Sequence, residues 1–457
     1  MGTLVRKQEL RHFNHSFLRP FLRAYGLGFL SYLSPRLFSL LLSKARRRRS
    51  NKQSRALVPA VLDIFKKSLE LHRFPAFCGV TIGGWHVLQP LFDKLLGHIP
   101  ESSGVGRYVN YHRSRIATFL ASSTSAAGAI QLLNTCKKSH DAGRTLDLTF
   151  FAVSKALDVI VGELWARRKA RRASSGKFTN FETKIGNAAD AVVFAASAAA
   201  ITFSWFYLPD RLPVSYNKWI TDIVDADSRL LETLRRIRAG VFVYGKDTGQ
   251  APLLQSMCED LGLPKVWGDP ALTKPIPCDI VHGGYSPSCE AHAIYRFWNA
   301  WKAGFLMYLG LNFLVRIRNP STKALLKALA DSAKSAAFLG TFVGSFWYAI
   351  CLTRTRLGPY VLPWIDQIHL DNYCVRVGSL ACGWSILIEP VHRRTEIAFF
   401  MAPKALATLF PRKYNREYLW IETLIFALSS GVVYTTLKEN PERVRGVFGK
   451  LLRRVVA

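Results

Sequence analysis

Four long stretches without a charged residue constrain this chain most. Each holds 19 to 21 uncharged residues, and they lie between Arg73 and Asp93, Arg115 and Lys137, Asp190 and Asp210, and Lys334 and Arg354. The hydrocarbon core of a bilayer is spanned by about 20 residues of α-helix. Four such windows favour a multi-pass helical membrane protein over a soluble protein with buried helices. Shorter apolar windows could span or lie at the interface: Ala24–Pro35, Ala303–Val315, Val377–Ile388 and Thr423–Leu437.

The net charge of the 457 residues is +31, from 62 Lys and Arg against 31 Asp and Glu. Such a charge fits either nucleic acid or a membrane surface as the partner. The basic residues gather in the gaps between apolar windows, at Arg46–Arg49, Arg167–Arg172, Arg316/Arg318, Arg393/Arg394, Arg412/Lys413 and Arg453/Arg454. This arrangement is typical of loops in a multi-pass protein and predicts a bilayer with anionic headgroups, and not nucleic acid, as the partner.

Five short matches recur in the same order along the chain and predict an internal duplication. We name the matched elements A to E; their sequence offsets are 276, 261, 260, 249 and 232 residues. Representative pairs are Gly28–Leu33 with Gly304–Leu309 for element A, and Phe194–Ala195 with Phe426–Ala427 for element E. Steadily falling offsets are expected when loops are shorter in the second copy.

The predicted fold is therefore an all-α, multi-pass membrane bundle built from two copies of a five-element unit. A basic N-terminal region with element A (1–56) precedes the first repeat (57–211). A linker outside the membrane (212–296) joins it to the second repeat (297–443), and a basic tail (444–457) follows. Apolar residues spaced three or four apart predict one amphipathic helix near 216–238 in the linker.

The segment Pro277–Cys289, the AAFLGTFVGSFW stretch and the FFMAPKAL stretch resemble the transmembrane protein 135 family. That family is similar in turn to the translocase channel family of the mitochondrial inner membrane. The resemblance covers the chain and is most specific from Cys278 to Leu437. It implies a multi-pass protein of mitochondrial or peroxisomal membranes, with links to organelle dynamics and lipid metabolism.

Both copies of element B carry a GxxxG motif, Gly79 with Gly83 and Gly340 with Gly344. Small residues four apart let two helix backbones approach closely in lipid. We expect these faces to pack within the chain, between the two element-B helices or against elements C. Dimerisation between two chains is the alternative, and other membrane proteins are alternative partners.

Lys155 and Lys404 follow an aromatic pair at matching places in element D. A charge inside a membrane helix is costly and usually faces a partner or a cavity. Acids at matching element starts are candidate partners: Asp147 and Glu396 in element D, Asp190 and Glu422 in element E. The hypothesis is a polar site for an anionic lipid or substrate; the alternative is a lysine that snorkels to the interface.

Cys278, His282, Cys289 and His292 make up the donor set of a structural zinc site, although their spacing is not that of a standard finger. A disulfide between Cys278 and Cys289 and a turn without any link remain alternatives. The other cysteines, Cys351 among them, lie in or near apolar windows and are interpreted as small core residues. No other cofactor is predicted.

Residues 1–56 contain 13 Lys and Arg but one acid, Glu9, which is compatible with mitochondrial targeting. The cluster Lys44, Arg46, Arg47, Arg48 and Arg49 is a candidate for binding anionic lipid headgroups, or else a solvated basic loop.

Common catalytic motifs are absent from the sequence, including Walker A, GxGxxG, GxSxG and HExxH. We therefore expect a protein that is not an enzyme and that acts in organelle maintenance or lipid handling. The alternatives are a channel or carrier with a path between the two repeats, and a membrane-embedded lipid enzyme.

Overall fold

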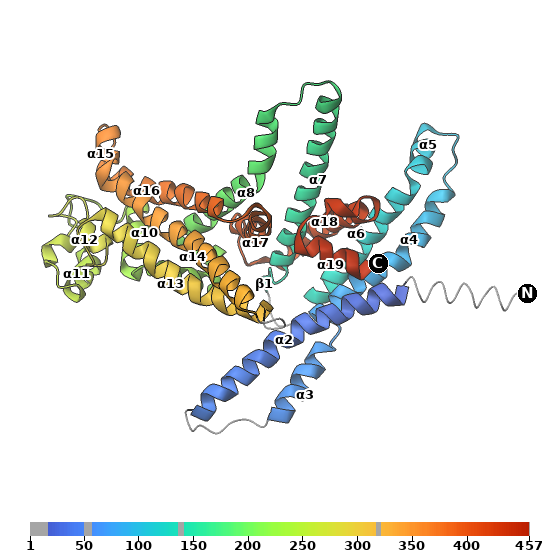
Figure 1. The fold of residues 1–457 in the computed structure, drawn as a ribbon, viewed down its shortest axis with the longest axis horizontal. Helices are drawn as coiled ribbons and strands as arrows, with labels where there is room; N and C mark the ends of the chain where they lie inside the picture. Colours follow the sequence, from blue (N-terminus) through green and yellow to red (C-terminus); the bar gives the residue numbers. More distant parts are fainter. Residues whose placement is uncertain (1–16, 50–56, 136–140, 317–320, 457) are drawn as a thin grey trace, which may run out of the picture. The chain divides into compact units, whose positions relative to one another are not determined.

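The computed structural model describes residues 17–49, 57–135, 141–316 and 321–456 (Figure 1). Within these ranges the regular structure is helical except for two antiparallel two-residue strands, so the all-α prediction is confirmed. The headgroup prediction falls on the end of helix α2, where the side chains of Lys44 and Arg46–Arg49 lie outside the description.

The chain forms two compact units. Unit 1 comprises Met1–Phe178 and Lys413–Ala457, and unit 2 comprises Thr179–Arg412. The elements of unit 1 are α2 (Arg19–Arg49), α3 (Leu57–Ser68), α4 (Phe74–Gly97), α5 (Gly104–Tyr111), α6 (Arg113–Asn134), β1 (Asp141–Ala142), α7 (Leu146–Ser174), β2 (Tyr414–Asn415), η6 (Arg416–Tyr418), α18 (Leu419–Glu439), η7 (Pro441–Arg443) and α19 (Gly446–Val456).

Unit 2 is one continuous segment of the sequence and contains the elements from α8 to α17. Its elements are α8 (Asn180–Tyr207), η2 (Pro209–Arg211), α9 (Val214–Val224), α10 (Ser228–Arg238), α11 (Ala251–Asp260), η3 (Lys265–Gly268), α12 (Cys278–Val281), α13 (Cys289–Arg316), α14 (Thr322–Cys351), η4 (Leu352–Arg356), α15 (Gly358–Val361), α16 (Gln367–Cys382), η5 (Gly383–Ile388) and α17 (Val391–Thr408).

In unit 1, α4 packs between α2 and α6, and α18 packs on α6 and α7. The core between them contains Trp85, whose ring centroid lies 5.2 Å from that of Tyr434 on α18. A second cluster joins Phe77 to Ile130 and Phe426. Helix α18, from the end of the chain, is therefore an integral part of the unit that the first 178 residues build.

In unit 2, α13 and α14 lie side by side along most of their length, and α14 also packs on α16 (Figure 1). Helix α8 packs on α16 and α17. Large buried rings fill the centre of this unit, among them Trp205, Phe206, Phe346 and Trp347. The end of α14 is fixed by a buried ion pair, in which Nε of Arg354 lies 2.6 Å from Oδ1 of Asp371.

Side-chain caps fix where several helices begin. Thr179 and Glu182 form a reciprocal capping box at the start of α8, and the Ser321 hydroxyl accepts a hydrogen bond from the Ala324 amide at the start of α14. The prediction of a single helix over 216–238 is wrong, because the chain breaks into α9 and α10. Asp225 ends α9 in the left-handed conformation, with φ of 52°, and the Asp227 carboxylate caps α10.

Among the described residues, four helices are long and apolar enough to cross a membrane: Arg113–Asn134, Asn180–Tyr207, Thr322–Arg356 and Arg416–Glu439. The first three contain most of three of the long uncharged windows. The window after Arg73 forms α4, which is outside this group because Trp85, His86, Gln89 and Pro90 lower its hydropathy.

The paired glycines contact the helix that precedes them. A Cβ atom at Gly79 would lie 2.9 Å from the Phe21 ring of α2, and one at Gly340 would lie 2.9 Å from the Phe297 carbonyl oxygen of α13. Gly83 and Gly344 face the same two phenylalanines. The expected partners, another element B or an element C, are therefore wrong for these faces, because the bulky side chain that needs the space belongs to element A.

Candidate functional site

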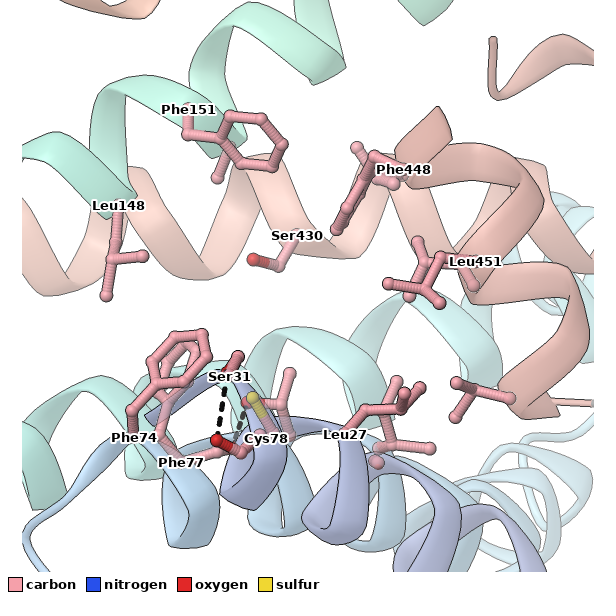
Figure 2. A pocket seen from close by; sticks show the side chains of 18 of the residues that line it. Leu27, Ser31, Phe74, Phe77, Cys78, Leu148, Phe151, Ser430, Phe448 and Leu451 are labelled. Carbon is pink, nitrogen blue, oxygen red and sulfur yellow. Dashed lines mark hydrogen bonds between the residues drawn. The ribbon is translucent and has the colours of Figure 1, made fainter. Parts of the chain in front are cut away.

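Unit 1 contains a cavity of about 710 Å³ between α2, α4, α7, α18 and α19. Figure 2 shows Phe151 and Phe448 on one side of this space and Leu27, Phe77 and Cys78 on the other. The Phe151 and Phe448 rings meet edge to face at a centroid distance of 4.9 Å. Pockets of about 300–1,000 Å³ with apolar walls are typical of small-ligand sites.

Lys155 is the one charged side chain among the described residues that line this cavity. It is 2% exposed, and its Nζ donates to the Arg445 carbonyl oxygen at 3.5 Å. The Phe151 ring centroid lies 5.9 Å from Nζ. The snorkelling alternative requires a side chain that extends outward, whereas this ammonium is enclosed by its own unit.

The mouth of the cavity is apolar and open. Leu27, Leu30 and Leu451 line it and are exposed. The hydroxyls of Ser31 and Ser34, which also line it, donate to carbonyl oxygens of their own helix at 2.9 and 2.7 Å. The entrance therefore suits a hydrocarbon chain better than a polar solute.

Unit 2 contains a smaller cavity of about 310 Å³ between α8, α9, α13, α14 and α17. Lys404 is half-buried beside it, with Nζ 4.0 Å from the centroid of Phe400 and 5.6 Å from that of Tyr216. Both rings line the cavity, and so does Glu396. The Lys404 ammonium therefore rests on aromatic faces.

Residues around the two cavities are related by the offsets of the sequence matches. The cavity-lining pairs include Phe151 with Phe400, Ala152 with Met401, Phe77 with Phe338, Thr81 with Phe342, Phe426 with Phe194, Phe448 with Tyr216 and Leu452 with Ile220. Lys155 and Lys404 obey the same 249-residue offset.

The two element-E acids predicted as lysine partners, Glu422 and Asp190, accept hydrogen bonds from hydroxyl groups. Glu422 is 4% exposed and accepts from Thr145 at 2.5 Å, from Thr149 at 3.1 Å and from Tyr414. Asp190 accepts from Thr395 at 2.5 Å. Each acid of element E thus binds a threonine at the start of an element-D helix. Asp147 is exposed in the first turn of α7.

Helix α19 is a cavity wall that the sequence interpretation missed. The segment was predicted only as part of a basic tail, although Phe448, Leu452 and Val455 recur at helical spacing and line the cavity. These residues match Tyr216, Ile220 and Ile223 of α9 at the 232-residue offset of element E. Extending that match beyond Arg443 was the signal that could have identified the helix.

A second cluster of functional side chains lies at the start of α13. The donor atoms of Cys278, His282 and Cys289 are all within 4.8 Å of one another. His292 stacks on His282, with ring centroids 4.2 Å apart. Cys351, which we expected to be a core residue, is buried with its Sγ 3.4 Å from Nε2 of His282. Cys278, Cys289 and Cys351 are free thiols.

Burial determines the protonation state of the two histidines in this cluster. It lowers the pKa of His282, and together with His282 and Arg296 it lowers the pKa of His292 to about 3. Both imidazoles are therefore neutral near pH 7. A neutral imidazole keeps one nitrogen lone pair for a hydrogen-bond donor or a metal ion.

Known proteins give no guide to these sites. Comparison with protein-family models, with curated proteins and with solved structures finds no match to this chain. The resemblance to the transmembrane protein 135 family remains an expectation from its motifs. Function is therefore inferred from the geometry of the cavities and clusters.

Proposed function

We propose that this chain is a multi-pass integral membrane protein that binds an anionic, amphipathic lipid in the cavity of unit 1. The observation that carries the proposal is a large apolar cavity with a buried lysine, Lys155, among its lining residues. A hydrocarbon chain would occupy the space between Leu27, Phe77 and Phe448. The phosphate or carboxylate of its headgroup would lie at Lys155.

The electrostatics of Lys155 support an anionic headgroup. An ammonium within an apolar environment is costly, so such a group usually faces a polar or charged partner; Lys155 donates to the Arg445 carbonyl oxygen at 3.5 Å. A phosphate or carboxylate would add a charge-assisted hydrogen bond, which is worth about 1.5–3 kcal/mol. Binding would therefore exchange or supplement the present contact of Lys155 with Arg445.

The proposal includes an internal duplication. The chain would contain two copies of one helical unit, and the last helix of each copy would pack in the unit formed by the other copy. Element E of the first copy would be α8, which belongs to unit 2, and element E of the second copy would be α18, which belongs to unit 1. The matched lining residues of the two cavities support this arrangement. So do the matched contacts of Gly79 with Phe21 and of Gly340 with Phe297, since the two phenylalanines are themselves 276 residues apart.

The proposed setting is a mitochondrial or peroxisomal membrane, as the family resemblance implies, with a role in lipid handling and not in catalysis. For the channel alternative, the small residues of elements C and E would have to line a path. In unit 1 these residues pack together instead: a Cβ atom at Gly431 would lie 2.2 Å from the Ser123 hydroxyl, and Ser125 donates to the Val80 carbonyl at 2.7 Å. This packing favours the lipid-binding proposal.

The test is the lipid that co-purifies with the full-length protein in mild detergent, measured by native mass spectrometry. Replacing Lys155 with Met removes the charge and retains the apolar stem. Because the lost contact is worth about 1.5–3 kcal/mol, occupancy by anionic lipid should fall about 10- to 100-fold. Lys155→Arg should preserve it.

Lys404→Met is the matched control, because that lysine lies on aromatic rings beside the smaller cavity. It should leave the anionic lipid bound at the wild-type level. Equal lipid occupancy in the wild type, Lys155→Met and Lys404→Met would contradict the proposed function.

A further inference from the structure

We propose that Cys278, His282, Cys289 and Cys351 form a tetrahedral structural zinc site in unit 2. Three thiolates and one imidazole are a standard donor set for structural zinc, and their softness selects this metal over magnesium or calcium. This site is independent of the lipid-binding proposal, because its residues do not line the cavity of unit 1.

The separation of two of the donors, His282 and Cys351, is close to the one that zinc requires. Zn–S bonds of about 2.3 Å and Zn–N bonds of about 2.0–2.1 Å place two ligand sulfurs about 3.8 Å apart, and a sulfur and a nitrogen about 3.6 Å apart. The observed Nε2–Sγ distance from His282 to Cys351 is 3.4 Å. The donors of Cys278, His282 and Cys289 lie within 4.8 Å of one another.

The orientation of His282 fits a zinc ligand. Its Nδ1 lies 2.6 Å from the Ser286 carbonyl oxygen, an acceptor, so Nδ1 carries the proton and donates. The lone pair of Nε2 then points toward Cys351. Metal-bound histidines usually donate their second ring nitrogen in this way, which fixes the tautomer and the ring plane.

The surroundings hold the donors in place and can balance their charge. His282, Cys289 and Cys351 are 1%, 3% and 2% exposed. Arg354, one turn beyond Cys351, donates to the Ile276 carbonyl oxygen at 3.1 Å and so links the end of α14 to the segment that contains Cys278. Zinc with three thiolates carries one net negative charge, and Arg356 lies close by, because it donates to the carboxylate of Glu290, the residue after Cys289, at 3.1 Å.

His292 takes a different position from the one that the sequence predicted. Its ring stacks on His282, and its Nε2 accepts a hydrogen bond from Arg296 at 3.4 Å. It therefore orients the His282 ligand, and Cys351 replaces it as the fourth donor. The zinc would join α12, α13 and α14, and would fix the turn-rich linker to the helices of unit 2.

The experiment measures zinc in the full-length protein, purified in detergent without added metal, by inductively coupled plasma mass spectrometry. The wild type should contain about one zinc per chain. Cys351→Ser should lose most of it. Cys374→Ser should retain it, because Cys374 is an equally buried cysteine of unit 2 that donates within α16. His292→Ala should also retain it.

Two further measurements keep the test decisive if Cys351→Ser does not fold. Cobalt exchanged into the wild-type protein should give a sulfur-to-cobalt charge-transfer band with the intensity of three thiolates. Chelation should lower the thermal midpoint of the wild type, and added zinc should restore it. A disulfide between Cys278 and Cys289, iron in place of zinc, or equal zinc in the Cys351→Ser and Cys374→Ser variants would overturn the proposal.

Discussion

The cavity of unit 1 has a volume of about 710 Å³, whereas its counterpart in unit 2 has about 310 Å³. Larger side chains occupy the matched positions in unit 2: Phe342 stands where unit 1 has Thr81, and Met401 where unit 1 has Ala152. The surroundings of the matched lysines also differ. Lys155 is buried beside the larger cavity, whereas the ammonium of Lys404 lies on two aromatic rings. The two cavities thus differ in how far side chains fill the space, and this difference is why the proposed lipid site is placed in unit 1.

The junction between the element-B and element-C helices gives the largest expected contrast. Arg354 and Asp371 have side chains that are 3% and 0% exposed, whereas Asp93, at the position that matches Arg354, pairs with Arg113 with both side chains 39% exposed. Replacing Asp371 with Asn leaves a buried guanidinium without its counter-charge and should cost about 3–5 kcal/mol. Asp93→Asn should cost about 0–1 kcal/mol. Thermal unfolding followed by tryptophan fluorescence measures both, and equal losses would contradict this comparison.

The glycine contacts give a smaller contrast. A Cβ at Gly340 would meet the Phe297 carbonyl oxygen, which cannot move without the helix, whereas a Cβ at Gly79 would meet only side-chain atoms, of the Phe21 and Tyr25 rings. Gly340→Ala should therefore destabilise the protein by about 1–3 kcal/mol, and Gly79→Ala by less. Gly310→Ala is the control, because its Cβ would meet open space, and it should stabilise α13 slightly. The reverse order for Gly340 and Gly79 would mean that the helix backbones are not in close contact there.

Filling the cavity of unit 1 should have the smallest effect on stability and a clear effect on the ligand. The double change Thr81→Phe and Ala152→Met installs the residues found at the matched positions of unit 2. The added side-chain volume fills existing space, so the free energy of unfolding should change by less than about 1.5 kcal/mol. Anionic lipid bound to the purified protein should fall about tenfold, equivalent to about 1.4 kcal/mol.

The control for the filled cavity is Ser43→Trp, a bulky change on the exposed face of α2 away from the cavity. It should leave both stability and bound lipid unchanged. Undiminished lipid in the filled variant would show that the lipid binds elsewhere on the protein.

Much of the fold could be predicted from local sequence. Uncharged windows predicted three of the four apolar long helices, because length and hydropathy are properties of contiguous residues. The break at Asp225 was not predictable from the apolar spacing, because that spacing continues across it. The helical backbone alone is interrupted there, by the left-handed conformation of Asp225 and by the Asp227 side chain, which caps the next helix. The GxxxG motifs predicted close packing, but small residues do not specify which neighbour fills the space.

The candidate sites were predictable in part. The two cysteines and two histidines of residues 278–292 indicated a candidate metal site, because these residue types are rare in a linker. Cys351 gave no such signal, since an apolar helix commonly contains a cysteine, and only the fold brings it beside His282. Likewise, matching offsets identified Lys155 and Lys404 as a pair, but their different surroundings depend on side chains from three or more helices.

Photo-crosslinking tests the central claim most directly. The probe is a phosphatidic acid with a diazirine in its acyl chain, incorporated into vesicles with the wild-type protein, followed by peptide mass spectrometry. Adducts should concentrate on the unit 1 cavity, at α2, α4 and α19, and should decrease there in Lys155→Met but not in Lys404→Met. Adducts spread evenly over the apolar helices, or unchanged by Lys155→Met, would contradict a specific lipid site in unit 1.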